Sequence, residues 1–213
     1  MADLDSAYFV KICGVTSLGD ANAAIDAGAS AIGLNLATSS RHLSLDRALA
    51  IAEATRGRVL RTLIFFDNDD ESIIQAVDLI DADVVQIHGA LSDSLLGQLR
   101  ERDVQIIKAL AIGTDEFYGF DESIVDAVMV DGATPGSGLS HSWEELAERS
   151  FGVPVIAAGG LNDNNVARVI ELTGAWGVDS ASGVESSPGI KDRDRMSDFV
   201  ANAQKAFRAR STT

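Results

Sequence analysis

Short apolar runs alternate with longer amphipathic stretches along this chain. The apolar runs cover residues 8–13, 31–36, 59–66, 83–88, 104–110, 127–131, 153–158 and 176–181. Most of them are rich in Val, Ile and Leu without strict alternation of apolar and polar positions. This pattern is typical of parallel strands that are covered on both faces. The pattern therefore predicts eight parallel β-strands.

Helical periodicity marks most of the segments between the apolar runs. Residues 17–28 place Ala21, Ala24 and Ile25 on one face and end at Gly28, a residue type that often follows a helix. Further helices are predicted over 45–55, 70–80, 92–102, 143–149, 164–172 and 192–209. The pattern in 115–123 is weak and predicts only a short helix.

The spacing of the apolar runs indicates the fold class. Their starts recur roughly every 20 to 25 residues, which is the length of one β/α unit. Eight such units predict an α/β chain that forms a single (β/α)8 TIM barrel with parallel strands over residues 1–213. A doubly wound open sheet is the alternative. It is disfavoured because the first run is followed by Cys13-Gly14-Val15-Thr16 rather than by a G-x-G-x-x-G turn.

Composition and charge limit the classes of molecule that the protein can bind and its location in the cell. The net charge of −15 argues against nucleic acid and against anionic membrane surfaces. No stretch is long and apolar enough to span a membrane, and residues 1–7 lack the features of a signal peptide. Cys13 is the single cysteine and excludes an internal disulfide, so a cytoplasmic location is expected.

Two ionisable residues stand where predicted strands end, the position that faces the active site in a TIM barrel. Cys13 closes the first run and Asp131 closes the sixth, so a thiol and a carboxyl group are candidates for acid–base chemistry. The alternative roles are a buried apolar thiol and a loop cap, respectively. The three histidines are scattered along the chain, and the sequence predicts no metal site.

Glycine-rich turns follow the seventh and eighth runs. Gly159-Gly160 and Ser182-Gly183 leave backbone N–H groups open to an anion, and loops at these two positions often bind phosphate in this fold. We therefore predict a phosphate site here, although both turns could serve only to reverse the chain. Asp179, just before the second turn, is expected to order it.

Several segments resemble phosphoribosylanthranilate isomerase of tryptophan biosynthesis, in the same order over nearly the whole chain. They are Lys11-Ile12-Cys13-Gly14, Gln86-Ile87-His88-Gly89, Val130-Asp131-Gly132 followed by Gly136-Ser137-Gly138, Ala158-Gly159-Gly160-Leu161-Asn162 and the run from Ser182 to Asp192. The first and last of these are the most specific to that family.

The resemblance implies an Amadori rearrangement of N-(5-phosphoribosyl)anthranilate without metal or cofactor. Asp131 would be the general acid that opens the ribose ring, and Cys13 the general base that removes the C2 proton. Lys11 lies two residues before Cys13 on the same side of the strand, so it could favour the thiolate, and a purely structural lysine is the alternative.

The resemblance also implies the substrate-binding residues. Arg41 would meet the anthranilate carboxylate, although a solvated loop charge is an alternative. His88 would lie near the substrate or satisfy loop backbone. Gly159, Gly160, Ser182 and Gly183 would hold the phosphate. The implied partner is a phosphorylated sugar–anthranilate molecule, and the implied assembly is a monomer or a homodimer.

Some positions depart from the family pattern. Asn35 is polar where the family keeps an apolar strand, the loop up to Arg41 is short, Ser142 replaces a carboxylate, and Ala181 lies beside the phosphate turn. These changes leave open a modified aromatic substrate or a non-catalytic phosphosugar-binding barrel. A histidine-pathway sugar isomerase is a third possibility, disfavoured because such enzymes use two aspartates and Cys13 occupies the first position.

Overall fold

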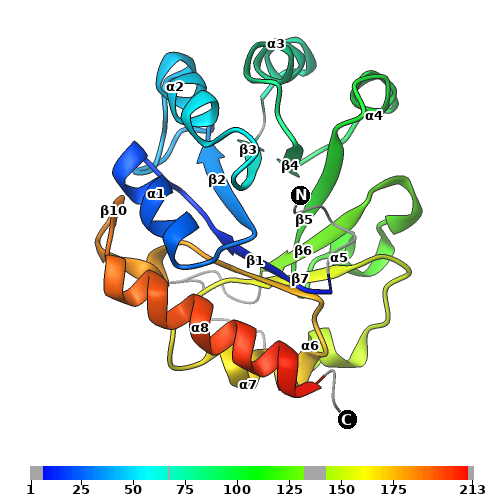
Figure 1. The fold of residues 1–213 in the computed structure, drawn as a ribbon. Helices are drawn as coiled ribbons and strands as arrows, with labels where there is room; N and C mark the ends of the chain where they lie inside the picture. Colours follow the sequence, from blue (N-terminus) through cyan, green and yellow to red (C-terminus); the bar gives the residue numbers. More distant parts are fainter. Residues whose placement is uncertain (1–6, 67, 132–142, 211–213) are drawn as a thin grey trace.

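Eight parallel strands close a barrel in the computed structural model of the chain, which describes residues 7–66, 68–131 and 143–210 (Figure 1). Each strand pairs with the next along the chain, and β8 returns to pair with β1. The strands are β1 (Phe9–Ile12), β2 (Ala31–Asn35), β3 (Leu60–Phe66), β4 (Val84–His88), β5 (Gln105–Ala111), β6 (Ala127–Asp131), β7 (Val155–Ala158) and β8 (Gly177–Ser180). The predicted (β/α)8 TIM barrel is confirmed.

Helices surround the barrel on its outer side (Figure 1). They are α1 (Leu18–Asp26), α2 (Leu45–Thr55), α3 (Asp70–Ile80), α4 (Asp93–Arg100), α5 (Asp115–Gly119), α6 (Trp143–Glu148), α7 (Val166–Thr173) and α8 (Arg193–Arg210). Polar side chains define several helix starts, because Ser17, Asp69, Ser92 and Thr114 each accept a hydrogen bond from the first turn. The short α5, followed by a 3₁₀ turn η1 (Glu122–Ile124), agrees with the weak pattern there.

A small hairpin between β8 and α8 is absent from the sequence-based expectation. The chain leaves β8 through a 3₁₀ turn η2 (Ser182–Val184) and forms the antiparallel strands β9 (Glu185–Ser187) and β10 (Ile190–Lys191). Gly189 has a φ of +80° at the turn, which glycine adopts without strain. The hairpin lies against the loop after β2, because a Cβ on Gly189 would come within 2.8 Å of the Ser40 carbonyl oxygen.

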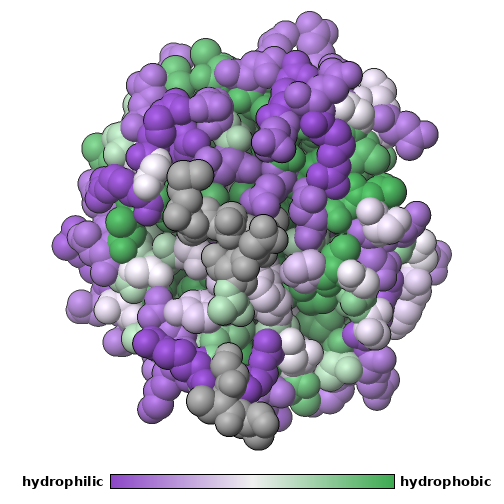
Figure 2. Space-filling model, turned by 45° about the vertical axis from the view of Figure 1, so that its right-hand side comes forward, coloured by the Kyte–Doolittle hydropathy of each residue, from purple (hydrophilic) through white to green (hydrophobic). Residues whose placement is uncertain are grey.

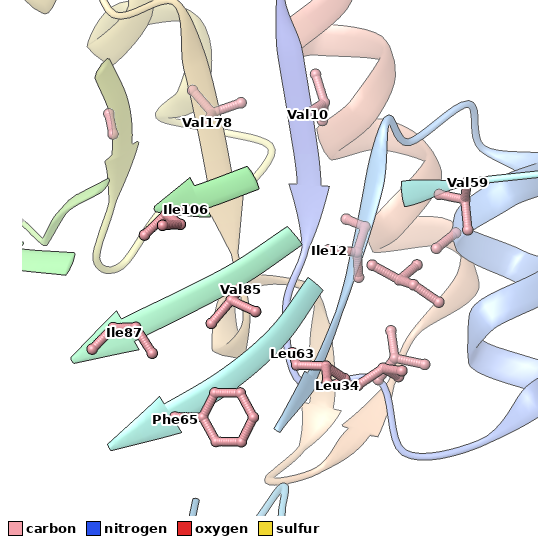
Figure 3. Close-up of a cluster of buried hydrophobic side chains, with 14 of the residues drawn as sticks. Val10, Ile12, Leu34, Val59, Leu63, Phe65, Val85, Ile87, Ile106 and Val178 are labelled. Carbon is pink, nitrogen blue, oxygen red and sulfur yellow. The ribbon is translucent and has the colours of Figure 1, made fainter. Parts of the chain in front are cut away.

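The strands have two apolar faces that form separate clusters. One cluster fills the barrel interior with residues such as Phe9, Ile107 and Met129, and Trp176 stacks on Phe9 with 5.2 Å between ring centroids. The other cluster lies between the barrel and its helices. Ten of its members are labelled in Figure 3, from Val10 on β1 to Val178 on β8. Apolar packing on both faces explains why the strands lack alternation in the sequence.

The surface is largely hydrophilic on the face shown in Figure 2, with scattered hydrophobic side chains between. Three of the four lysines are buried, namely Lys11, Lys108 and Lys191, whereas Lys205 is exposed. The lysines therefore serve mainly inside the fold. No helix in the described part of the chain is long and apolar enough to cross a membrane.

Candidate active site

The carboxyl-terminal ends of the eight strands form one rim, and both predicted catalytic residues, Cys13 and Asp131, lie at this rim. Alternation along β1 turns Phe9 and Lys11 into the barrel, and Cys13 follows on the same side immediately after the strand. His88 ends β4 and Asp131 ends β6 at the same rim. The structure thus brings these three side-chain positions to one mouth of the barrel.

Cys13 is held firmly against the first two strands. Its backbone N–H donates to the Ser180 carbonyl oxygen at 2.9 Å, which extends the pairing of β1 and β8 by one residue. A Cβ on Gly33 of β2 would lie 3.3 Å from the Cys13 Sγ atom and 3.1 Å from its Cα. Glycine at position 33 therefore makes room for the thiol, and Cys13 as a whole residue is partly exposed to solvent.

Lys11 and Asp179 form a buried ion pair inside the barrel, two residues before Cys13 along the first strand. Lys11 Nζ donates to Asp179 Oδ1 at 2.9 Å, and the two side chains are 0% and 7% exposed. The expectation that Asp179 orders the loop after β8 is wrong. Its carboxylate points into the barrel instead, because β1 and β8 place Lys11 and Asp179 at the same register position.

Opposing charges act on the pKa of the Cys13 thiol. Burial raises this pKa and the Asp179 carboxylate raises it further, whereas Lys11 and Lys191 lower it. The net direction is upward. Burial alone would lower the pKa of Lys11, but Asp179 and Cys13 keep it above its usual value, so Lys11 stays charged. The predicted influence of Lys11 on the thiol is present, but burial outweighs it.

The raised pKa of Cys13 has a measurable consequence. Because only the thiolate is alkylated, the rate of iodoacetamide modification is expected to rise with pH, with a midpoint above that of a small thiol such as N-acetylcysteine. Cys13 is the single cysteine, so incorporated label reports on this side chain alone. A midpoint at or below that of N-acetylcysteine would contradict the electrostatic balance described above.

Asn35 organises the loop after β2. Its Oδ1 atom accepts from the Ala37 backbone N–H at 2.8 Å, and its Nδ2 atom donates to the Ser39 hydroxyl at 3.0 Å. That hydroxyl in turn accepts from the Arg41 backbone N–H at 3.1 Å. The polar residue at the end of β2 thus fixes the short loop that carries Arg41.

Arg41 lies over the residue next to Cys13. A Cβ on Gly14 would come within 2.3 Å of the Arg41 Cδ atom, and Gly14 has a φ of +68°. The guanidinium donates to Glu185 through Nε at 2.7 Å and through Nη2 at 2.8 Å. Its hydrogen bond with Glu185 raises the pKa of Arg41, so the group is positively charged at all relevant pH values.

His88 is a neutral group at the rim. Burial, together with the charges of Lys11 and Lys108, lowers the pKa of His88 to about 4. One ring nitrogen, Nε2, lies 2.8 Å from Gln86 Nε2, and the ring of Phe66 is 5.9 Å away between centroids. At neutral pH, His88 can therefore act as a hydrogen-bonding group but adds no positive charge.

Asp131 is half-buried at the end of β6, beside Ala111 of β5 and Ala158 of β7. Around the closed barrel, β7 and β8 separate it from β1, so Asp131 and Cys13 lie across the mouth from each other. Gly132, the Gly136-Ser137-Gly138 motif and Ser142 lie outside the described residues.

The two glycine-rich turns adjoin each other at the rim. Gly159 and Gly160 have φ values of +90° and +69°. A Cβ on Gly183 would lie only 1.8 Å from the Leu161 carbonyl oxygen, which also accepts from the Ser180 hydroxyl at 2.6 Å. The loops after β7 and β8 therefore pack backbone against backbone.

Replacing Gly183 with alanine is expected to separate these loops. The added methyl group cannot fit beside the Leu161 carbonyl, so the backbone must shift. We expect about 1–3 kcal/mol of lost stability in thermal or urea unfolding, within the range of overpacking effects. Gly97 is a matched control, because a Cβ there meets open space and Gly97→Ala is expected to leave stability unchanged or raise it. Equal effects of the two substitutions would contradict the close packing.

Glu185 and Lys191 are site residues to which sequence reasoning assigned no role. Both side chains are buried, and Lys191 Nζ donates to Glu185 Oε1 and to the Ala181 carbonyl oxygen, each at 2.9 Å. The Pro188-Gly189 pair between them is a turn signal that could have indicated the hairpin. Among the described residues, no group of three or more His, Cys, Asp or Glu side chains is arranged to hold a metal ion.

A family model and individual relatives among known sequences carry the same description. The sequence model described as N-(5'-phosphoribosyl)anthranilate isomerase matches residues 10–202. A relative of that name from Haloarcula marismortui is 35% identical over 207 residues, covering 92% of this chain and 96% of its own length. Another, from Bradyrhizobium sp. strain ORS 278, is 32% identical over 210 residues, with 92% and 95% covered.

Solved structures agree with the sequence relatives. The phosphoribosyl anthranilate isomerase of Thermotoga maritima has a TM-score of 0.79 and 30% identity, covering 93% of this chain and 99% of its own. A second structure holds reduced 1-(o-carboxyphenylamino)-1-deoxyribulose 5-phosphate and has a TM-score of 0.78 and 28% identity, with 93% and 99% covered. The match over residues 10–202, together with these relatives, shows that the chain belongs to the N-(5'-phosphoribosyl)anthranilate isomerase family of enzymes.

Proposed function

We propose that this chain converts N-(5-phosphoribosyl)anthranilate (PRA) into 1-(2-carboxyphenylamino)-1-deoxyribulose 5-phosphate, with Cys13 as general base and Asp131 as general acid. The observation that carries the proposal is the position of the two groups. Cys13, a partly exposed residue just after β1, and Asp131 at the end of β6 lie at the same barrel mouth. The family to which the chain belongs supplies the substrate.

The first step opens the ribose ring. Asp131 donates a proton to the ring oxygen while the bond between that oxygen and C1 breaks. The lone pair of the anthranilate nitrogen forms a double bond to C1, which gives a protonated Schiff base. This transfer leaves Asp131 as a carboxylate, and the proton that Cys13 takes from C2 in the second step balances the one that Asp131 gives up.

The second step removes the proton from C2. The Cys13 thiolate takes this proton, and the C–H electron pair forms a double bond between C2 and C1. The nitrogen recovers its lone pair, which yields an enolamine. Tautomerisation to the aminoketone then completes an isomerisation in which no atom is gained or lost. Lys11 and Lys191 support this step because each favours the thiolate over the thiol.

Groups around the rim suit the two ends of the substrate. We assign the phosphate to the backbone N–H groups of Gly159, Gly160, Ser182 and Gly183, whose turns adjoin each other. Arg41 would bind the anthranilate carboxylate, since a guanidinium matches a carboxylate in shape and charge. His88, neutral at pH 7, would donate or accept a hydrogen bond rather than contribute charge.

Growth of a tryptophan auxotroph tests the proposal in a cell. A bacterial strain that lacks its own PRA isomerase is expected to grow without tryptophan when it expresses this chain. The same strain carrying the Cys13→Ala, Asp131→Asn double variant is expected to require tryptophan. No growth with the wild-type chain, although immunoblotting shows soluble protein, would contradict the proposed function.

A further inference from the structure

We infer that Glu185 is a positioning residue that aims the guanidinium of Arg41 at the carboxylate of the substrate. This inference rests on the proposed function and deepens it, because it concerns how the site selects a carboxylated aromatic ring. It is carried by the contacts that connect the hairpin after β8 with the loop after β2.

The carboxylate of Glu185 holds Arg41 in one orientation. Two parallel hydrogen bonds, from Nε at 2.7 Å and from Nη2 at 2.8 Å, fix both the position and the plane of the guanidinium. The Glu185 side chain is only 4% exposed, whereas that of Arg41 is 24% exposed. The buried Glu185 carboxylate therefore sets the direction of the partly exposed Arg41 guanidinium.

Lys191 fixes the carboxylate of Glu185 by a second ion pair. Its Nζ atom donates to Glu185 Oε1 and to the Ala181 carbonyl oxygen, and its side chain is fully buried. Burial alone would raise the pKa of Glu185, but the hydrogen bonds from Arg41 and Lys191 hold it below its usual value. Glu185 is thus ionised, and two cations share its single negative charge. Burial lowers the pKa of Lys191, whereas the pKa of Arg41 is raised, so Arg41 is the cation that suits an anionic ligand.

Arg41 retains a free edge toward such a ligand. The Glu185 carboxylate accepts hydrogen bonds from one edge of the Arg41 guanidinium, which carries the Nε hydrogen and one Nη2 hydrogen. In the described part of the chain, no group binds Nη1 of Arg41. A guanidinium offers a second pair of parallel N–H groups at its end, from Nη1 and Nη2. The Arg41 stem lies beside Gly14, the residue after Cys13, and Cys13 acts electrostatically on the guanidinium. This end can therefore receive a carboxylate at the site while Glu185 remains bound.

The same contact has an opposite interpretation that can be separated by experiment. Glu185 could instead compete with the substrate, so that Arg41 must leave it before binding a carboxylate. A positioning residue strengthens substrate binding, whereas a competitor weakens it. Removing the charge of Glu185 therefore changes affinity in opposite directions under the two interpretations.

A double-mutant cycle tests the inference. Glu185→Gln, Arg41→Met and the combined variant are compared with the wild-type protein in kcat and KM for PRA. Each variant is also titrated with two analogues by calorimetry, namely the reduced product 1-(2-carboxyphenylamino)-1-deoxyribitol 5-phosphate and the same molecule without its carboxylate. Glu53→Gln, at an exposed position of α2, is the matched control for loss of one carboxylate.

We expect Glu185→Gln to raise KM, and the Kd of the carboxylated analogue, by about tenfold, with kcat within about threefold of wild type. The same substitution in the Arg41→Met background is expected to change neither value. The analogue without the carboxylate is expected to bind Glu185→Gln and wild-type protein equally.

Two results would overturn the inference while leaving the isomerase function intact. One is tighter binding by Glu185→Gln, which would make Glu185 a competitor. The other is equal weakening for both analogues that persists without Arg41, which would make its role structural. A wild-type protein that binds the two analogues with the predicted difference but converts no PRA would refute the proposed function alone. Binding of neither analogue by wild-type protein would refute both.

Discussion

Replacing Cys13 with serine is expected to lower kcat for PRA by about 10³-fold, with KM changed by less than about threefold. Serine keeps the size and position of the side chain, but its hydroxyl is far less acidic than a thiol and cannot serve as the base at C2. General acid–base catalysis by one positioned group contributes about 10²–10⁴-fold, and the loss falls in the chemical step. Steady-state kinetics with PRA generated in situ measures the change.

Chemical modification gives an independent check on Cys13. Iodoacetamide should inactivate the wild-type protein, and the rate of inactivation should fall when the reduced product analogue is present. The residual activity of Cys13→Ser should be insensitive to the same reagent, because no other cysteine exists in the chain. Near-normal turnover by Cys13→Ser, or by fully alkylated protein, would remove the thiol from the mechanism.

Asp131→Asn is expected to reduce kcat by about 10²–10³-fold. Asparagine preserves the shape of the residue at the end of β6, but it cannot transfer a proton to the ring oxygen. Binding should be affected far less than turnover, since Arg41 and the phosphate turns remain intact. Steady-state kcat, together with the Kd of the reduced product analogue, separates the two effects.

Asp126→Asn provides a matched control at the other end of the same strand. Asp126 precedes β6, binds Arg100 and accepts from the Ile106 backbone N–H at 2.7 Å, away from the carboxyl-terminal rim. This substitution should lower the Tm and leave kcat near the wild-type value. Equal losses of kcat in the two variants would mean that Asp131 acts through stability rather than catalysis.

Sequence alone predicted the barrel because local pattern determines most of it. Apolar runs of the right length and spacing placed all eight strands to within two residues of their observed bounds. The rule that active sites lie at strand ends then selected Cys13 and Asp131. These inferences need only the chain near each residue, together with the general geometry of the fold. That residues 1–213 form a single domain, and that the protein is a monomer or a homodimer, stays a prediction.

The interactions that tune the site could not be predicted, because they join distant positions. Lys11 and Asp179 are 168 residues apart, and Arg41 and Glu185 are 144 residues apart. Only the closure of β8 onto β1, and the packing of the hairpin on the loop after β2, make them neighbours. The role of Asp179 was therefore misjudged, and Glu185 received no role. Side-chain pairing across a closed barrel depends on register, which the sequence pattern does not specify.

The most direct test of the account is the loss of PRA fluorescence in the presence of purified protein. PRA is generated in situ, and product formation is followed by chromatography and mass spectrometry. We expect rapid, protein-dependent loss of fluorescence with stoichiometric formation of the deoxyribulose phosphate product, and almost none with the Cys13→Ala, Asp131→Asn double variant. Loss at the spontaneous rate with folded wild-type protein, or equal rates for the wild-type and the double variant, would contradict this expectation.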